Sequence, residues 1–140
     1  MDRLLVYASH HPWLAAFAVA SALAVVAYEL LLHVRNNASI APQEAIRLMN
    51  QGATVLDVRT LEAYAQGHIN GARHFDAAQI LQAGETLKRY KERPLIIYCD
   101  RGSVGAAAVR TLARQGFTKV FSLRGGLTAW RAEHLPLARE

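Results

Sequence analysis

The sequence predicts an α/β domain with a mostly parallel central sheet flanked by helices on both faces, preceded by one transmembrane helix. Two observations carry this prediction. From residue 40 onward, short β-branched runs alternate with helical stretches, which is typical of βαβ units. Before them, residues 13–32 read WLAAFAVASALAVVAYELLL, in which only Ser21 and Glu29 are clearly polar. A chain of 140 residues holds one small domain with an appendage. We therefore divide it into a tail (1–12), a transmembrane helix (13–34), a linker (35–39) and a domain (40–140).

The apolar run is long enough to cross a membrane. Twenty helical residues at about 1.5 Å each span about 30 Å, the thickness of a bilayer's hydrocarbon core. Trp13 at one end and Tyr28 with Arg35 at the other suit the two interfaces, and Glu29 lies one turn from the end. A cleaved signal peptide is the alternative, because residues 20–22 (Ala-Ser-Ala) have the small-x-small form of a cleavage site. Cleavage there would leave an exposed apolar stub. An ordinary core helix is excluded, because nothing polar repeats every 3.6 residues.

The domain that follows is predicted to contain buried parallel strands and at least two helices. The strand candidates are short apolar runs at residues 54–58, 94–99 and 119–123. One helix is expected to start at Pro42 and to stop at Gly52. The other is the Ala-rich stretch 102–115, which Gly116 closes.

The net charge of +5 belongs to this domain. Residues 1–35 hold two of the 16 Lys and Arg and two of the 11 Asp and Glu, so their charges cancel. A basic run such as Lys-Arg-Tyr-Lys at 88–91 is usually a solvated face, and near a bilayer it attracts anionic lipid. No basic stripe is interleaved with aromatic residues, so binding to nucleic acid is not expected.

The chain has a single cysteine, which excludes an internal disulfide and a Cys-based zinc cluster. Cys99 ends a predicted strand immediately before a helix, and open α/β sheets bind ligands at this end of their strands. The helix amino terminus favours a thiolate, and successive loop amides can hold an anion. The loop residues are Asp100, Arg101, Gly102, Ser103, Val104 and Gly105, of which Arg101 adds a positive charge. A buried structural cysteine is the alternative.

Three motifs, which occur in the family's order, resemble the rhodanese family. The first is TVLDVR (54–59) with the later GHINGA (67–72). The second is LIIYC with the loop CDRGSVG (95–105), which resembles the family's active-site strand and loop. The third is V-x-x-L-x-G-G-x-x-x-W over residues 120–130. The similarity runs from about residue 40 to residue 137, and one span before a single domain resembles small bacterial membrane-anchored rhodaneses.

This resemblance implies a sulfurtransferase or persulfide carrier. The Cys99 thiolate would take the outer sulfur of a thiosulfate-like donor and pass it to a thiol or to cyanide, without a metal or an organic cofactor. The implied partners are a small anionic sulfur donor, a thiol acceptor and the lipid bilayer, with a membrane-protein partner left open. We expect a single-pass protein of the bacterial inner (cytoplasmic) membrane. Arg3 before the span and Arg35 after it leave the orientation close to a tie, but thiol chemistry favours a cytoplasmic domain.

The loop departs from many rhodaneses at two positions. Val104 and Gly105 stand where side-chain donors are common, so we expect reduced use of thiosulfate. A non-catalytic interaction module that docks partners at the membrane is the main alternative. A cysteine phosphatase or arsenate reductase is disfavoured, because the position that would hold the phosphate-binding Arg is Gly105.

Other singled-out residues are predicted to support the fold. Asp57, Arg59 and Glu62 are expected to form a polar network, and His68 is expected to anchor a loop. The remaining residues of this kind lie in the third motif. Gly125 and Gly126 should allow a tight turn close to the Cys99 loop, and Trp130 should lie in the core or in a pocket wall.

Overall fold

The computed structural model describes residue 6 and residues 9–139. The chain divides into two compact units, Met1–Asn36 and Asn37–Glu140. Most of the predicted tail (1–12), including Arg3, lies outside the described residues.

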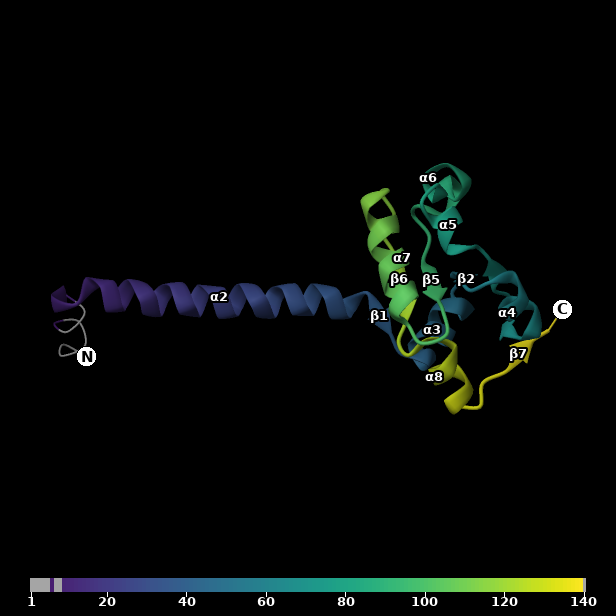
Figure 1. Cartoon of the computed structure of the whole chain (residues 1–140), viewed down its shortest axis with the longest axis horizontal. Coiled ribbons are helices and arrows are strands. Elements are labelled where there is room, and N and C mark those ends of the chain that lie inside the picture. Colours follow the sequence, from purple (N-terminus) through teal and green to yellow (C-terminus); the bar gives the residue numbers. More distant parts are fainter. Residues whose placement is uncertain (1–5, 7–8, 140) are drawn as a thin grey trace. The chain divides into compact units, whose positions relative to one another are not determined.

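The first unit consists mainly of helix α2 (Pro12–Asn37), which confirms a long apolar helix at this place (Figure 1). Its segment Pro12–Leu31 is long and apolar enough to cross a membrane by length and composition. Inside this segment the hydroxyl of Ser21 donates a hydrogen bond to the carbonyl of Phe17 at 2.9 Å, so its polar group is satisfied within the helix. Whether the helix crosses a membrane stays a prediction.

The second unit is built on the predicted parallel sheet. In the described residues the sheet has five strands in the order β1-β6-β5-β2-β4, and every pair of neighbours is parallel. These strands are β1 (Ser39–Ile40), β2 (Thr54–Asp57), β4 (Arg73–His74), β5 (Leu95–Tyr98) and β6 (Val120–Leu123). The three predicted strands are confirmed as β2, β5 and β6. They are the longest strands and lie side by side in the centre.

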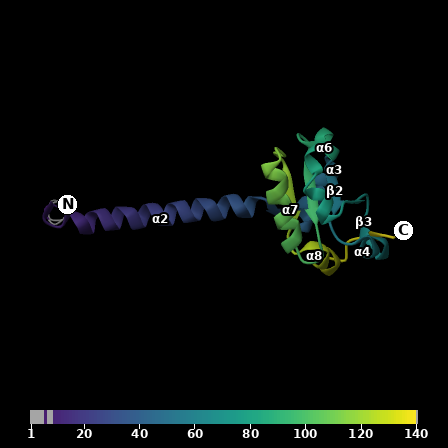
Figure 2. The ribbon, with the colours of Figure 1, turned by 45° about the horizontal axis from the view of Figure 1, so that its top comes forward.

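Helices cover both faces of this sheet, as predicted, because the central strands are apolar on both sides. Along β5, Leu95 and Ile97 belong to one buried cluster, whereas Ile96 and Tyr98 belong to the other. The first cluster includes residues of α5 (Ala77–Ile80), α6 (Ala83–Thr86), the 3-10 helix η1 (Lys88–Tyr90) and α7 (Ser103–Arg114). The second includes residues of α3 (Pro42–Asn50) and α8 (Gly126–Ala132). Figure 2 shows α7 and α8 at the sheet from a second direction.

Two features differ from the sequence-based expectation. Most of the expected linker (35–39) is regular structure, because α2 continues to Asn37 and β1 begins at Ser39. A small antiparallel sheet joins β3 (His68–Ile69) to β7 (Leu137–Ala138), and α4 (Leu61–Gln66) precedes β3. Strands of only two residues, such as β3 and β7, show too little periodicity to be recognised in a sequence.

A close backbone approach links α8 to the end of β5. Gly126 adopts a left-handed conformation with φ of 57°, and a Cβ atom there would overlap the carbonyl oxygen of Cys99. The same Cβ would lie 2.8 Å from the carbonyl carbon of Asp100. Only glycine fits this position without moving the backbone that follows Cys99.

We therefore expect Gly126→Ala to lower the free energy of unfolding by about 3 kcal/mol or more, because it combines a left-handed conformation with a backbone overlap. Gly52→Ala is the matched control, since Gly52 has φ of 94° but nothing within 4 Å of an added Cβ. Its cost should stay at about 1–2 kcal/mol. Urea denaturation of the full chain in detergent micelles measures both values. Equal losses in the two variants would contradict the overlap.

Candidate active site

Cys99 directly follows β5 at the carboxyl edge of the sheet, where the sequence analysis placed it. Its residue is only 5% exposed, and it packs against the apolar cluster on the α7 side of the sheet. Its sulfur accepts hydrogen bonds from the backbone N–H of Gly102 at 3.1 Å and of Gly105 at 3.4 Å. The thiol is thus held by the chain segment that follows it in the sequence.

These donors belong to the start of α7. The first N–H groups of a helix have no acceptor within the helix, and the helix dipole adds partial positive charge there. Gly102, with φ of 100°, turns the chain so that the helix begins directly beside the sulfur. This arrangement places N–H donors and partial positive charge beside the sulfur, where they can hold an anionic group attached to it.

Helix α8 fixes the same loop from its other side. The N–H groups of Leu127 and Thr128 donate to the carbonyl oxygens of Cys99 and Asp100 at 2.8 and 3.0 Å. The hydroxyl of Thr128 donates to the carbonyl of Asp100 at 2.9 Å. The first turn of α8 therefore satisfies the loop carbonyls, while the loop N–H groups stay directed toward the sulfur.

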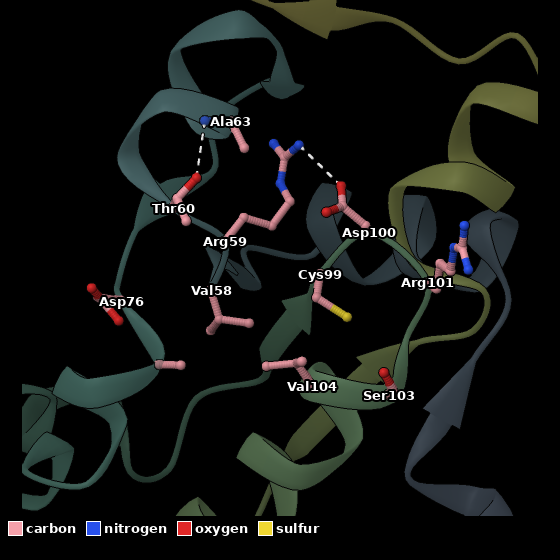
Figure 3. Close-up of a pocket in the computed structure, with 11 residues that line it drawn as sticks. Val58, Arg59, Thr60, Ala63, Asp76, Cys99, Asp100, Arg101, Ser103 and Val104 are labelled. Carbon is pink, nitrogen blue, oxygen red and sulfur yellow. Dashed lines mark hydrogen bonds and ion pairs between the residues drawn. The ribbon is translucent and has the colours of Figure 1, made fainter.

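A pocket of about 660 Å³ opens in front of Cys99 (Figure 3). Its lining comes from three segments of the chain, residues 58–63, 76–77 and 99–104, that meet at the carboxyl edge. These residues are Val58, Arg59, Thr60, Ala63, Asp76, Ala77, Cys99, Asp100, Arg101, Ser103 and Val104. Figure 3 shows Val58 and Val104 beside Cys99, Asp76 across the pocket, and Arg101 on the far side of the loop.

A buried ion pair forms the back of this pocket. The guanidinium of Arg59 donates to both carboxylate oxygens of Asp57, with the shortest contact at 2.6 Å, and to the carbonyl of Gly67 at 2.7 Å. It also reaches the carboxylate of Asp100 at 3.5 Å. The hydroxyl of Tyr98 donates to Asp57 at 2.7 Å and accepts from the N–H of Ile69 at 3.1 Å.

Burial and charge shift two pKa values in this network. Burial alone would lower the pKa of Arg59, but its hydrogen bonds to Asp57 and the negative charges of Asp57 and Asp100 raise it overall. Burial raises the pKa of Tyr98 well above its usual value, and the hydrogen bond to Asp57 and its negative charge raise it further. Arg59 therefore stays cationic and Tyr98 stays protonated.

The structure separates the two loop positions that depart from the family pattern. Val104 is 46% exposed and lines the pocket, so its side chain determines what a ligand meets there. Gly105 is buried, and a Cβ atom on it would lie 3.3 Å from the carbonyl oxygen of Ile97. A side chain at Gly105 would therefore point at β5 and away from the pocket.

The residues predicted to support the fold have different surroundings, and of Asp57, Arg59, Glu62, His68 and Trp130 only Arg59 lines the pocket in front of Cys99. Asp57 and Arg59 pair, but Glu62 is exposed, and no hydrogen bond or ion pair in residues 9–139 joins it to them. His68 is buried; its Nδ1 lies 3.0 Å from the carbonyl oxygen of Tyr64, and its ring stacks on that of Tyr64. Trp130 is a core residue whose indole N–H donates to the carbonyl of Pro136 at 3.1 Å.

The glycine pair and several pocket residues complete the comparison with the sequence. Gly125 and Gly126 lie against the Cys99 loop, since a Cβ on Gly102 would come within 3.3 Å of the Gly125 nitrogen. Tyr98 and the pocket residues Val58, Thr60, Ala63, Asp76 and Ala77 were not predicted from the sequence to belong to the site. Val58 and Thr60 follow the neighbouring strand β2, so the carboxyl-edge rule could have found them. Among the described residues, no group of three or more His, Cys, Asp or Glu side chains could hold a metal ion.

Comparison with known proteins identifies the family to which this site belongs. Residues 41–133 match the family described as the rhodanese-like domain. The chain belongs to the rhodanese family. It is 40% identical over 93 residues to the thiosulfate sulfurtransferase GlpE of Ectopseudomonas mendocina, covering 66% of this chain and 84% of the relative. The corresponding protein of Pseudomonas paraeruginosa is 38% identical over 95 residues, covering 66% of this chain and 83% of the relative.

Solved structures agree with this assignment. The solution structure of the rhodanese-like domain of the Anabaena protein Alr3790 superposes with a TM-score of 0.65 at 29% identity. The match covers 74% of this chain and 80% of that one. The chain is a rhodanese-type sulfurtransferase with a single rhodanese domain.

The raised pKa of Tyr98 in this rhodanese domain makes stability depend on pH in the alkaline range. Below pH of about 10, the phenol is protonated in both the folded and the unfolded chain. Above it, the unfolded chain releases this proton while the folded chain keeps it, so the free energy of unfolding falls as pH rises. The expected slope is up to about 1.4 kcal/mol per pH unit from this residue alone.

Tyr98→Phe removes this contribution, so its unfolding free energy should fall less steeply between pH 10 and 11 than that of the parent. At neutral pH the variant should be less stable by about 1–3 kcal/mol, because the Asp57 carboxylate and the Ile69 N–H lose a partner. Urea denaturation across this pH range measures both effects. The other tyrosines are present in both proteins, so their contributions cancel in the difference between the two pH profiles. Parallel pH profiles would contradict the assignment to Tyr98.

Proposed function

We propose that this protein is a membrane-tethered sulfurtransferase and persulfide carrier, with Cys99 as the nucleophile. The carrying observation is the position of the Cys99 sulfur: it accepts two backbone N–H hydrogen bonds and lies at the base of a pocket of about 660 Å³. The names of the GlpE relatives, thiosulfate sulfurtransferases, support a thiosulfate-like donor.

Sulfur transfer then proceeds as two displacements at sulfur. The Cys99 thiolate attacks the outer sulfur of the donor, a new S–S bond forms, and the donor's S–S bond breaks with its electron pair leaving on sulfite. The enzyme now carries a Cys99 persulfide. An acceptor thiolate attacks the outer sulfur of this persulfide, and the Cys99 thiolate leaves with the electron pair of the broken bond. Neither step needs an oxidant or a reductant.

The loop amides supply the electrostatic stabilisation that both steps require. The N–H groups of Gly102 and Gly105 stabilise negative charge on the Cys99 sulfur, both before the first attack and as it leaves in the second. The first-turn N–H groups of Ser103 and Val104 have no acceptor within α7, so they can face the added sulfur. These donors belong to the rigid start of a helix and need no rearrangement between steps.

The apolar segment of α2 supports the tether. Pro12–Leu31 is long and apolar enough to span a bilayer, and it joins the rhodanese domain through a short connection. We place the protein in a bacterial inner membrane with its domain in the cytoplasm, because thiolate chemistry suits the reducing compartment. The thiol acceptor is a small molecule or a protein of that compartment.

We expect incubation of the full chain, in detergent micelles, with thiosulfate or with other sulfane donors to add one sulfur atom, about 32 Da. Intact-protein mass spectrometry measures the gain, and a small thiol or cyanide should remove it. Cys99→Ser should show no gain, because it lacks the nucleophile. If the parent protein stays unmodified with every donor, the catalytic proposal is wrong, and a docking module on the same fold is favoured.

The nature of the side chain at Val104 should set the use of thiosulfate. Val104→Arg or Val104→Ser places a donor at the pocket wall, so we expect kcat/KM for thiosulfate to rise by about 10- to 150-fold, the value of one added hydrogen bond to a charged group. Val104→Ala is the matched control, since it shortens the side chain without adding a donor. Unchanged values in both donor variants would mean that the backbone amides suffice.

A further inference from the structure

Six cationic side chains gather where the strands of the sheet begin, at the edge opposite Cys99. We call this group the basic edge. It consists of Lys88, Arg89, Lys91, Arg93, Arg114 and Lys119. Five of them are exposed, and Lys91 is half-buried. The segments that carry these cations, residues 85–93 and 114–119, hold only two acidic residues, Glu85 and Glu92. The two segments together therefore contribute +4 to the net charge of +5.

Backbone contacts hold these residues together. Lys119 directly precedes β6, and only Pro94 separates Arg93 from the paired strand β5. The N–H of Leu95 donates to the carbonyl of Lys119 at 2.8 Å. The N–H of Thr118 donates to the carbonyl of Lys91 at 3.4 Å. Arg114 is the last residue of α7, whose C-terminal end lies near α6, away from α8 (Figures 1 and 2).

No ion pair within residues 9–139 neutralises this edge. The ion pairs in these residues lie outside the basic edge: they join Arg47 to Glu44, and Arg59 to Asp57 and Asp100. The edge that carries Cys99 is balanced by comparison. Its cations are Arg59, Arg101 and Arg124, and its anions are Asp57, Asp76 and Asp100. The domain's charge is therefore asymmetric along the direction of the strands.

We propose that the basic edge binds the anionic phospholipid surface of the membrane that anchors α2. This inference rests on the proposed anchoring. The connection from Leu31 to Ala38 spans at most about 25 Å when fully extended, so the tether keeps the domain near the surface in any conformation. The attraction acts within about 10 Å of anionic headgroups.

The tether limits distance, and the charge asymmetry sets orientation. With the basic edge on the headgroups, the Cys99 loop at the opposite edge faces the aqueous phase, from which a water-soluble donor and acceptor arrive. A nucleic acid fits this edge less well, because Tyr90 and Phe117, the aromatic side chains of these segments, are buried and cannot stack on bases.

Hydrogen exchange of the full chain in lipid nanodiscs tests this proposal. In discs containing phosphatidylglycerol, amides of residues 88–93 and 116–119 should exchange about fivefold more slowly than in discs of phosphatidylcholine alone, since one surface cation contributes about that factor. The difference should disappear at about 1 M salt, where the screening length is about 3 Å. Equal exchange in the two lipids would overturn the proposal, as would a difference that survives the salt.

Charge variants separate the basic edge from net charge. The triple variant Lys88→Gln, Arg89→Gln, Arg93→Gln should lose the lipid-dependent protection. The control triple variant Arg47→Gln, Arg131→Gln, Arg139→Gln changes net charge equally on exposed residues elsewhere and should keep it. Sulfur loading of Cys99 checks folding in both. Loss of protection in the control variant as well would overturn the assignment to this edge.

The same preparation distinguishes the two proposals. A chain that does not incorporate into discs contradicts the anchoring by α2, whereas a chain that incorporates without lipid-dependent protection contradicts only the basic edge. In the first case, co-sedimentation with phosphatidylglycerol vesicles, using the same variants, tests the edge itself. Absence of binding there would overturn it.

Discussion

The buried pair of Asp57 and Arg59 is the interaction on which the rest of the site depends. Asp57 is fully buried, and an unpaired carboxylate there would cost several kcal/mol. Its partners come from different places: Arg59 follows the same strand, and Tyr98 ends the neighbouring strand directly before Cys99. Through Arg59 the pair also holds the Gly67 carbonyl and the Asp100 side chain. One carboxylate thus aligns β2, β5 and the start of the Cys99 loop.

The Cys99 loop is held from two sides, which explains how backbone atoms can act as a binding site. Helix α8 takes the loop carbonyls, and α7 presents its N–H groups to the sulfur. Because the loop carbonyls are hydrogen-bonded to α8, the orientation of the loop peptide groups is fixed. The N–H donors therefore stay directed toward the sulfur without a ligand. Gly126, the first residue of α8, follows from this arrangement, because a side chain there would separate α8 from the loop.

Much of this fold was predictable from the sequence, and the exceptions have physical causes. The runs at β2, β5 and β6 are apolar on both faces and long enough to recognise, so the parallel sheet and the place of Cys99 followed. Two-residue strands such as β3 and β7 carry no usable pattern. The sequence places Tyr98 in a strand but does not predict its role in the site, because its hydrogen bond to Asp57 depends on the strand register. The expectation that Glu62 joins the network of Asp57 and Arg59 was wrong. Glu62 is close to Arg59 in the sequence, but it lies in α4 with its side chain exposed.

The depth of Cys99 has a consequence for chemical selectivity. The thiol is only 5% exposed, packs against the apolar core and lines one pocket, so a reactant reaches it through that pocket. A terminal sulfur, bonded on one side alone, reaches it with its free end first. A sulfur inside a disulfide carries substituents on both sides and meets the pocket wall. If Cys99 is the nucleophile, a site of this shape favours attack on a terminal sulfur over attack on a sulfur within a disulfide.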